Sequence, residues 1–314
     1  KYPNSFCVVS NVSDVGSVLG IKRKILGASE IVPSCSSPEW ATVIIIEHTR
    51  GTEHKIAVDV FHSMLCDTEN GGTHNIQQSE RRGHLEVNHA QQLCGTLLDV
   101  ETILSNRNGV LQEKLAHGCS LFVRLEECAG ESSSMGSFKF HVRGLDCQNT
   151  RRNFLDRPDF VFEIRRKQRG KTQDSWALVY RSNVAKATCN PYWEQDVVDL
   201  ATLVNNDVDR DLQISIYDTP SRILLGYATT TIPGLIGAVS ESGNADKALD
   251  IVKPSHSLLH STTRQGKLVV LHASLSMANT GGSSHGGSLN ESSFTPCAPQ
   301  ERQESLSNLP QAVA

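Results

Sequence analysis

Two stretches of this sequence repeat one pattern: residues 28–40 read ASEIVPSCSSPEW and residues 181–193 read RSNVAKATCNPYW. Aligned without a gap, they share a serine, a β-branched residue two places later, a proline and a tryptophan, which are Ser29, Ile31, Pro38 and Trp40 in the first copy and Ser182, Val184, Pro191 and Trp193 in the second. Further along, residues 58–62 (VDVFH) lie over residues 214–218 (ISIYD), and Gly83 and Gly226 follow. We infer that one module occurs twice along the chain, and we expect the tryptophan of each copy to pack in the core of that copy.

Short runs of β-branched or alternating apolar residues, separated by polar turns, dominate both copies. They predict strands at 6–9, 42–47, 55–61 and 120–125 in the first copy, and at 138–142, 160–165, 176–181, 211–217, 227–232 and 267–273 in the second. Only residues 93–104 and 197–204 indicate a short helical turn. Many short strands at regular spacing favour an antiparallel β-sandwich.

The composition changes at two places that divide the chain. Residues 130–136 (GESSSMG) are small and polar and are interpreted as a linker. From residue 278 the chain is rich in Gly, Ser, Gln and Pro, and this composition predicts a disordered tail. We therefore expect domains at 1–129 and 137–277, followed by the tail at 278–314.

Composition and motifs exclude several classes of function. A net charge of -4 argues against a generally nucleic-acid-binding protein. The nine cysteines are scattered with no CxxC pair, which favours a reduced intracellular protein over a zinc or redox site. No Walker-type loop or HExxH motif is present, so we expect a binding protein rather than an enzyme.

The run LVYRSNVAKATCNPYW at 178–193 resembles the second C2 domain of the copine family, and residues 27–40 resemble the same segment of the first copine C2 domain. Residues 160–164 (FVFEI) and 224–226 (LLG) fit the same template. The resemblance covers roughly residues 1–277 and does not extend to the von Willebrand A-type domain of copines. It implies two tandem C2-type, eight-stranded antiparallel Greek-key β-sandwiches, the first N-terminally incomplete and degenerate.

The resemblance also implies calcium binding by loop aspartates at one tip of each sandwich. In the second copy the candidates are Asp156, Asp159 and Asp218. Pro220 and Arg152 replace two of the family's aspartates, and Asn4 replaces one in the first copy. Because Ca²⁺ needs several oxygen ligands, we expect at most a weak residual site, with ordinary loop carboxylates as the alternative.

Basic residues offer a route to membranes that needs no calcium. The candidate lipid-binding residues are Arg165, Arg166, Lys167, Arg169 and Lys171 after one predicted strand, with Lys22, Arg23 and Lys24 in the comparable hairpin of the first copy. Each basic residue near an anionic leaflet contributes on the order of 1 kcal/mol. A solvated hairpin tip and an acidic protein partner remain alternatives.

The sequence thus predicts a copine-like protein of the cytoplasm that binds anionic phospholipid or phosphoinositide at the inner face of the plasma membrane. Its calcium dependence is doubtful because most loop aspartates are replaced. A protein-interaction scaffold built on C2 modules that no longer bind lipid is the alternative.

Overall fold

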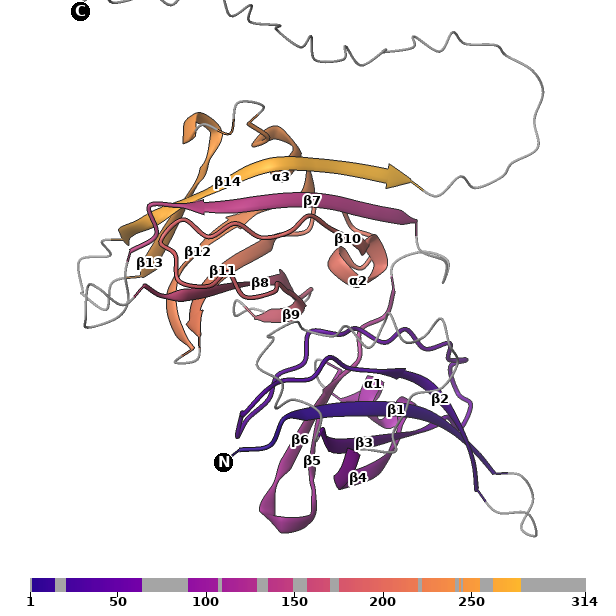
Figure 1. Ribbon diagram of the computed structural model, residues 1–314. Helices are drawn as coiled ribbons and strands as arrows, with labels where there is room; N and C mark the ends of the chain where they lie inside the picture. Colours follow the sequence, from indigo (N-terminus) through magenta and orange to yellow (C-terminus); the bar gives the residue numbers. More distant parts are fainter. Residues whose placement is uncertain are drawn as a thin grey trace, which may run out of the picture. The chain divides into compact units, whose positions relative to one another are not determined.

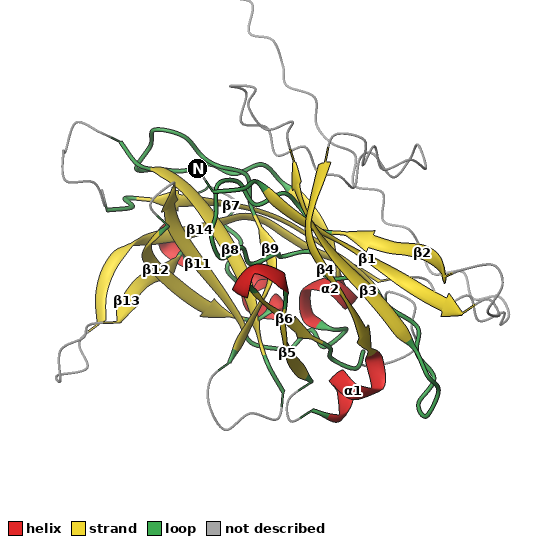
Figure 2. Cartoon of the chain, turned by 90° about the horizontal axis from the view of Figure 1, so that it is seen from below, coloured by secondary structure: helices red, strands yellow, loops and turns green. Residues whose placement is uncertain are grey.

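The computed structural model describes residues 2–14, 21–63, 90–106, 109–128, 135–148, 157–169, 175–219, 222–240, 243, 245–254 and 262–277 (Figure 1). The predicted tail at 278–314 and most of the predicted linker at 130–136 lie outside these residues, and the division into domains stays a prediction. The described residues are mostly strands, which confirms the all-β fold class (Figure 2). No described helix is long and apolar enough to cross a membrane.

The second β region comprises eight strands, as predicted: β7 (Gly136–Leu145), β8 (Asp159–Lys167), β9 (Trp176–Arg181), β10 (Asp196–Asp199), β11 (Leu212–Thr219), β12 (Ile223–Thr230), β13 (Leu249–Pro254) and β14 (Thr262–Met277). Hydrogen bonds connect them in the order β10-β7-β14-β13-β12-β11-β8-β9, with every pairing antiparallel. Only one residue pair, Tyr227 with Val252, joins β12 to β13. The sheet is therefore two four-stranded halves joined at one point.

The two halves of the second region enclose one core, as in a sandwich. Phe138 and Phe140 of β7 and Phe162 of β8 belong to the same buried cluster, although they come from opposite halves. At the junction, a Cβ on Gly226 would lie 2.8 Å from the carbonyl oxygen of Val252. The backbones of β12 and β13 approach each other closely here, so only glycine fits.

The first β region comprises six described strands: β1 (Ser5–Asp14), β2 (Ile21–Ala28), β3 (Lys55–Ser63), β4 (Ala90–Asp99), β5 (Val110–Lys114) and β6 (Ser120–Arg124). A four-stranded sheet has the order β2-β1-β3-β4, and β5 and β6 form a separate pair. The order β2-β1-β3-β4 matches the order β9-β8-β11-β12 of the second region, and the β5-β6 pair corresponds to β13-β14. Strands equivalent to β7 and β10 are missing from the described residues, so this region has fewer strands than the eight expected.

The predicted strand at 42–47 is wrong, and the repeat explains why. By its place after Trp40, this segment corresponds to β10, which follows Trp193 and pairs with β7. In the described part of the first region no strand takes the position of β7. A β-branched run forms a strand only where a neighbouring backbone completes its hydrogen bonds, so residues 42–47 remain irregular.

Three short helices follow strands, and one predicted strand boundary is wrong. A short helical turn was expected within residues 93–104, where β4 continues to Asp99 and the Asp99 side chain caps α1 (Val100–Ser105). Helix α2 (Leu200–Val204) lies within the predicted 197–204. The strand expected at 227–232 ends at Thr230, because Thr231 caps α3 (Ile232–Gly237) through a hydrogen bond from Gly234 N to its Oγ1.

The repeated residues make the same hydrogen bonds in both regions. Ser29 Oγ accepts from Cys7 N and Ser182 Oγ accepts from Phe162 N, at 2.9 Å in each case. Trp193 Nε1 donates to Phe160 O at 3.3 Å, and the corresponding bond in the first region runs from Trp40 to Ser5 O at 3.2 Å. Trp193 is buried in the core as predicted, and Trp40 packs half-buried against the first core. These matching bonds confirm the internal repeat.

Candidate functional site

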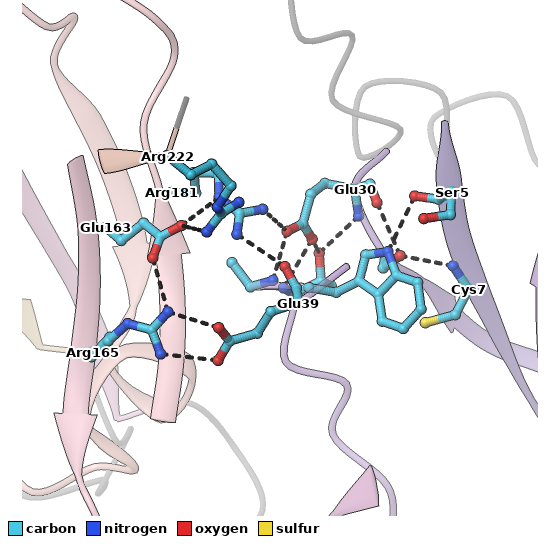
Figure 3. Close-up of polar contacts among 12 residues, drawn as sticks. Ser5, Cys7, Glu30, Glu39, Glu163, Arg165, Arg181 and Arg222 are labelled. Carbon is cyan, nitrogen blue, oxygen red and sulfur yellow. Dashed lines mark hydrogen bonds and ion pairs between the residues drawn. The ribbon is translucent and has the colours of Figure 1, made fainter. Parts of the chain in front are cut away.

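Three arginines of the second β region surround one buried carboxylate, Glu163 (Figure 3). Glu163 and Arg165 share a face of β8 because strand side chains alternate, and Arg181 lies opposite Glu163 on β9. Arg165 Nη2 and Arg181 Nε each lie 2.9 Å from a Glu163 oxygen, and Arg222 Nη2 lies at 3.1 Å. We call Arg165, Arg181 and Arg222 the arginine face.

The charge of Glu163 depends on this arrangement. Its side chain is 1% exposed, and burial by itself would raise its pKa. The positive charges of Arg181 and Arg165 outweigh that effect and lower the pKa below its ordinary value. Glu163 is therefore ionised and holds the guanidinium groups in place.

Two further carboxylates, from the segment after β2, complete the network. Glu39 accepts two hydrogen bonds from Arg165, from Nη1 at 3.0 Å and Nη2 at 2.7 Å. Arg181 donates to Glu30 Oε1 at 3.1 Å and to the backbone oxygen of Glu39 at 2.9 Å. Three arginines thus face three glutamates, and the arginine face is electrically balanced in this arrangement.

Arg166, a candidate lipid-binding residue, points to the opposite face of β8 and is 7% exposed. Its Nη2 lies 3.0 Å from Glu126, and its Nη1 lies 2.9 Å from the backbone oxygen of Thr202. Arg210, 5% exposed, contacts the other oxygen of Glu126 at 2.5 Å. A lipid headgroup could reach Arg166 only if this buried triad opened.

The other candidate basic residues of the second region have acidic neighbours or lie outside the description. Lys167 Nζ is 3.3 Å from Asp211, and Arg169 Nη2 is 2.6 Å from Asp207. Both side chains are more than one third exposed, so these pairs are weak and open readily. Lys171 lies outside the described residues.

The candidate residues of the first region lie on edge strand β2, where Lys22, Arg23 and Lys24 are all exposed. Arg23 Nη1 contacts Asp59 at 2.9 Å, with its own side chain 52% exposed. Ile25, the next residue, is 50% exposed. This strand therefore offers positive charge beside an exposed apolar side chain.

Of the three candidate calcium ligands, Asp159 begins β8 and Asp218 lies near the end of the neighbouring β11, where Asp159 pairs with Thr219 and Asp218 with Phe160. Asp159 Oδ1 already accepts from Ala187 N at 2.7 Å, and Asp218 is 2% exposed. Asp156 lies outside the described residues. Within the described ranges, no three His, Cys, Asp or Glu side chains gather closely enough to hold a metal ion. Two carboxylates fall short of the six to eight oxygens that Ca²⁺ takes.

No family model matches the chain. Among solved structures, BON1-C2B is 14% identical with a TM-score of 0.38, covering 46% of this chain and 94% of that one. The paired C2 domains of extended-synaptotagmin 2 are 14% identical with a TM-score of 0.23, covering 88% of this chain and 86% of that one. Their calcium-bound form gives a TM-score of 0.24 at the same identity, covering 88% of each chain.

The similar structures are C2 domains. At this identity and these TM-scores they do not decide the fold of this chain, for which the strand order and registers are the basis. They do not show the copine family either, and the copine resemblance stays a prediction.

Arg222, Glu30 and Glu39 were not recognised as site residues from the sequence. The repeat contained a signal for the two glutamates: they stand where the second copy has Asn183 and Tyr192. A charge present in only one copy is not needed by the shared fold, so it is a candidate for a contact specific to that copy. Their arginine partners follow only from the folded structure.

Proposed function

We propose that this chain is a copine-like peripheral membrane protein that binds anionic phospholipid, including phosphoinositides, through its C2-like β regions. The observation that supports the proposal is the arginine face. Arg165 presents two parallel N–H donors to a carboxylate, and a forked guanidinium in this geometry also recognises phosphate oxygens. Glu163 holds that fork in position before any ligand arrives.

The exposed strand β2 supplies a second contact. Lys22, Arg23 and Lys24 add about 1 kcal/mol each near an anionic leaflet. Ile25 can enter the headgroup boundary beside them. The cytoplasmic leaflet of the plasma membrane carries most of the anionic lipid that these residues would meet, and we propose it as the site of action.

We propose that this binding is largely independent of calcium. Two of the candidate calcium ligands, Asp159 and Asp218, are among the described residues. Both already take part in intramolecular interactions. Vesicle binding should therefore be compared in calcium and in chelator, with equal binding expected.

Sedimentation with vesicles of neutral lipid, with or without phosphatidylinositol bisphosphate, tests the proposal. Substituting Arg165→Gln and Arg181→Gln should weaken binding at least tenfold, because two contacts of about 1 kcal/mol each are lost. Arg264→Gln is a matched control, since Arg264 is an exposed arginine on β14 that pairs with Asp250 of β13 at 2.6 Å. Circular dichroism of each variant checks that it is folded.

A competition experiment avoids the need for substitutions. Soluble inositol trisphosphate should displace the unmodified chain from the phosphoinositide vesicles. If the chain binds no vesicle at low or high salt, the lipid proposal is wrong. That result would favour the protein-interaction scaffold, which the balanced charges of the arginine face also suit.

A further inference from the structure

Glu39 occupies the fork of Arg165 in the way that a phosphate ligand would. Both of its carboxylate oxygens face the guanidinium, at 3.0 and 2.7 Å. Carboxylate and phosphate oxygens use the same parallel donors, so Glu39 and a lipid headgroup cannot both have them. The headgroup must replace Glu39 before it can bind Arg165 in this geometry.

The Glu39 side chain is suited to exchange. It is 49% exposed, whereas the side chain of Arg165 is 16% exposed and also held by Glu163. Because water reaches the Glu39 carboxylate, moving it away from Arg165 costs less than breaking a fully buried ion pair. Rotation of the Glu39 side chain into solvent would open the fork without disturbing a strand.

The backbone around Glu39 keeps the carboxylate close to the fork. Ser34 N donates to Asn4 Oδ1 at 2.9 Å, and Trp40 Nε1 donates to Ser5 O, so hydrogen bonds on both sides of Glu39 attach the segment to the start of β1 and the residue before it. A tethered carboxylate has a high effective concentration at its partner. It therefore competes with a headgroup that must arrive from the membrane.

We propose that Glu39 is an intramolecular competitor that lowers the affinity of the arginine face for phosphate headgroups. This inference rests on the proposed function, because it concerns the same lipid-binding site. Membrane binding at this face then requires exchange: a headgroup phosphate must replace Glu39 at Arg165, so binding strengthens where anionic phosphate is dense. Sparse anionic lipid would leave the fork closed.

The test compares Glu39→Gln with the unmodified chain on vesicles containing phosphatidylinositol bisphosphate. Removing the competing charge should tighten binding by up to about fivefold, the range of an exposed ion pair. Glu47→Gln is the matched control: Glu47 is exposed in the same segment and its loss changes the net charge equally. It should leave binding within about a factor of two, the size of a general charge effect.

A second pair of variants covers the case in which glutamine still accepts a bond from Arg165. Glu39→Lys should tighten binding more than Glu47→Lys does, although both reverse one charge. Adding Arg165→Gln to Glu39→Gln should remove the gain, because the released fork is then absent.

The outcomes separate the two proposals. If the unmodified chain and both Glu39 variants all fail to bind, the proposed function is wrong. If the unmodified chain binds through Arg165 but the Glu39 variants bind no better than their Glu47 controls, the competition is wrong and the function stands. A gain that survives Arg165→Gln would also overturn the competition, because it would arise elsewhere.

Discussion

Replacing Glu126 by glutamine should destabilise the fold far more than the same change one residue later. Glu126 lies between two buried guanidinium groups, with Arg166 at 3.0 Å and Arg210 at 2.5 Å, 7% and 5% exposed respectively. Burial by itself would raise the pKa of Glu126, but Arg166 and Arg210 lower it on balance. Glutamine keeps the shape and removes the charge, so two like charges remain buried without compensation.

Breaking a buried ion pair by removing one partner costs about 3–5 kcal/mol. The side chain of Glu126 is 22% exposed, so water relieves part of this penalty and we expect a loss of about 3 kcal/mol. Glu127 is the internal control, because its side chain is 62% exposed and its partner Arg50 is 76% exposed. Glu127→Gln should cost at most about 1 kcal/mol.

Equilibrium unfolding in urea, followed by tryptophan fluorescence, gives both free energies on the same chain. The difference between the two variants should disappear in acid, because a lowered carboxyl pKa contributes stability above the unfolded value of about 4.3 and loses it as the pH falls through the folded value. Equal losses for Glu126→Gln and Glu127→Gln at neutral pH would refute the reasoning. So would a difference between them that persists unchanged in acid.

Other consequences of the structure can be measured separately. Ser182→Ala should cost about 1–3 kcal/mol in urea unfolding, because it leaves a buried backbone N–H without an acceptor; Ser29→Ala should act in the same direction in the first region, and a neutral result for both would contradict the shared role. Because the pKa of Glu163 is lowered, its contribution to stability is present above about pH 4.3 and is lost in more acidic solution. Glu163→Gln should therefore flatten the fall in unfolding free energy measured in acid, and an unchanged slope would argue against an ionised Glu163. Burial raises the pKa of Cys147 to about 12, so iodoacetamide at pH 8 should label exposed Cys119 and spare Cys147 until the chain unfolds; equal labelling rates would contradict that burial.

The strands and the repeat were accessible from the sequence because their causes are local. Short runs of apolar, β-branched and aromatic residues on β8 and β9 predicted those strands closely, and the repeated serine and tryptophan predicted equivalent environments. The segment at 42–47 has the same local pattern and yet forms no strand. A strand requires a hydrogen-bonded neighbour, and the sequence of a segment cannot supply one.

The basic residues show the same contrast between what a local sequence pattern predicts and what the folded structure decides. Arg165 and Arg166 were both predicted as lipid-binding residues, but neighbours in a strand point to opposite faces. The Arg166 guanidinium lies in a buried triad with Glu126 and Arg210. The Arg165 guanidinium faces Glu163 and Glu39. Their different surroundings depend on segments that are distant in the chain.

The sequence by itself determined the repeated all-β module, because alternation and turn chemistry act over a few residues. Only the tertiary structure decided which charges are balanced, because the partners are far apart: Glu39 and Arg165 are separated by 126 positions and meet through side chains alone. Coulomb attraction and burial depend on distance in space, which the order of residues does not give.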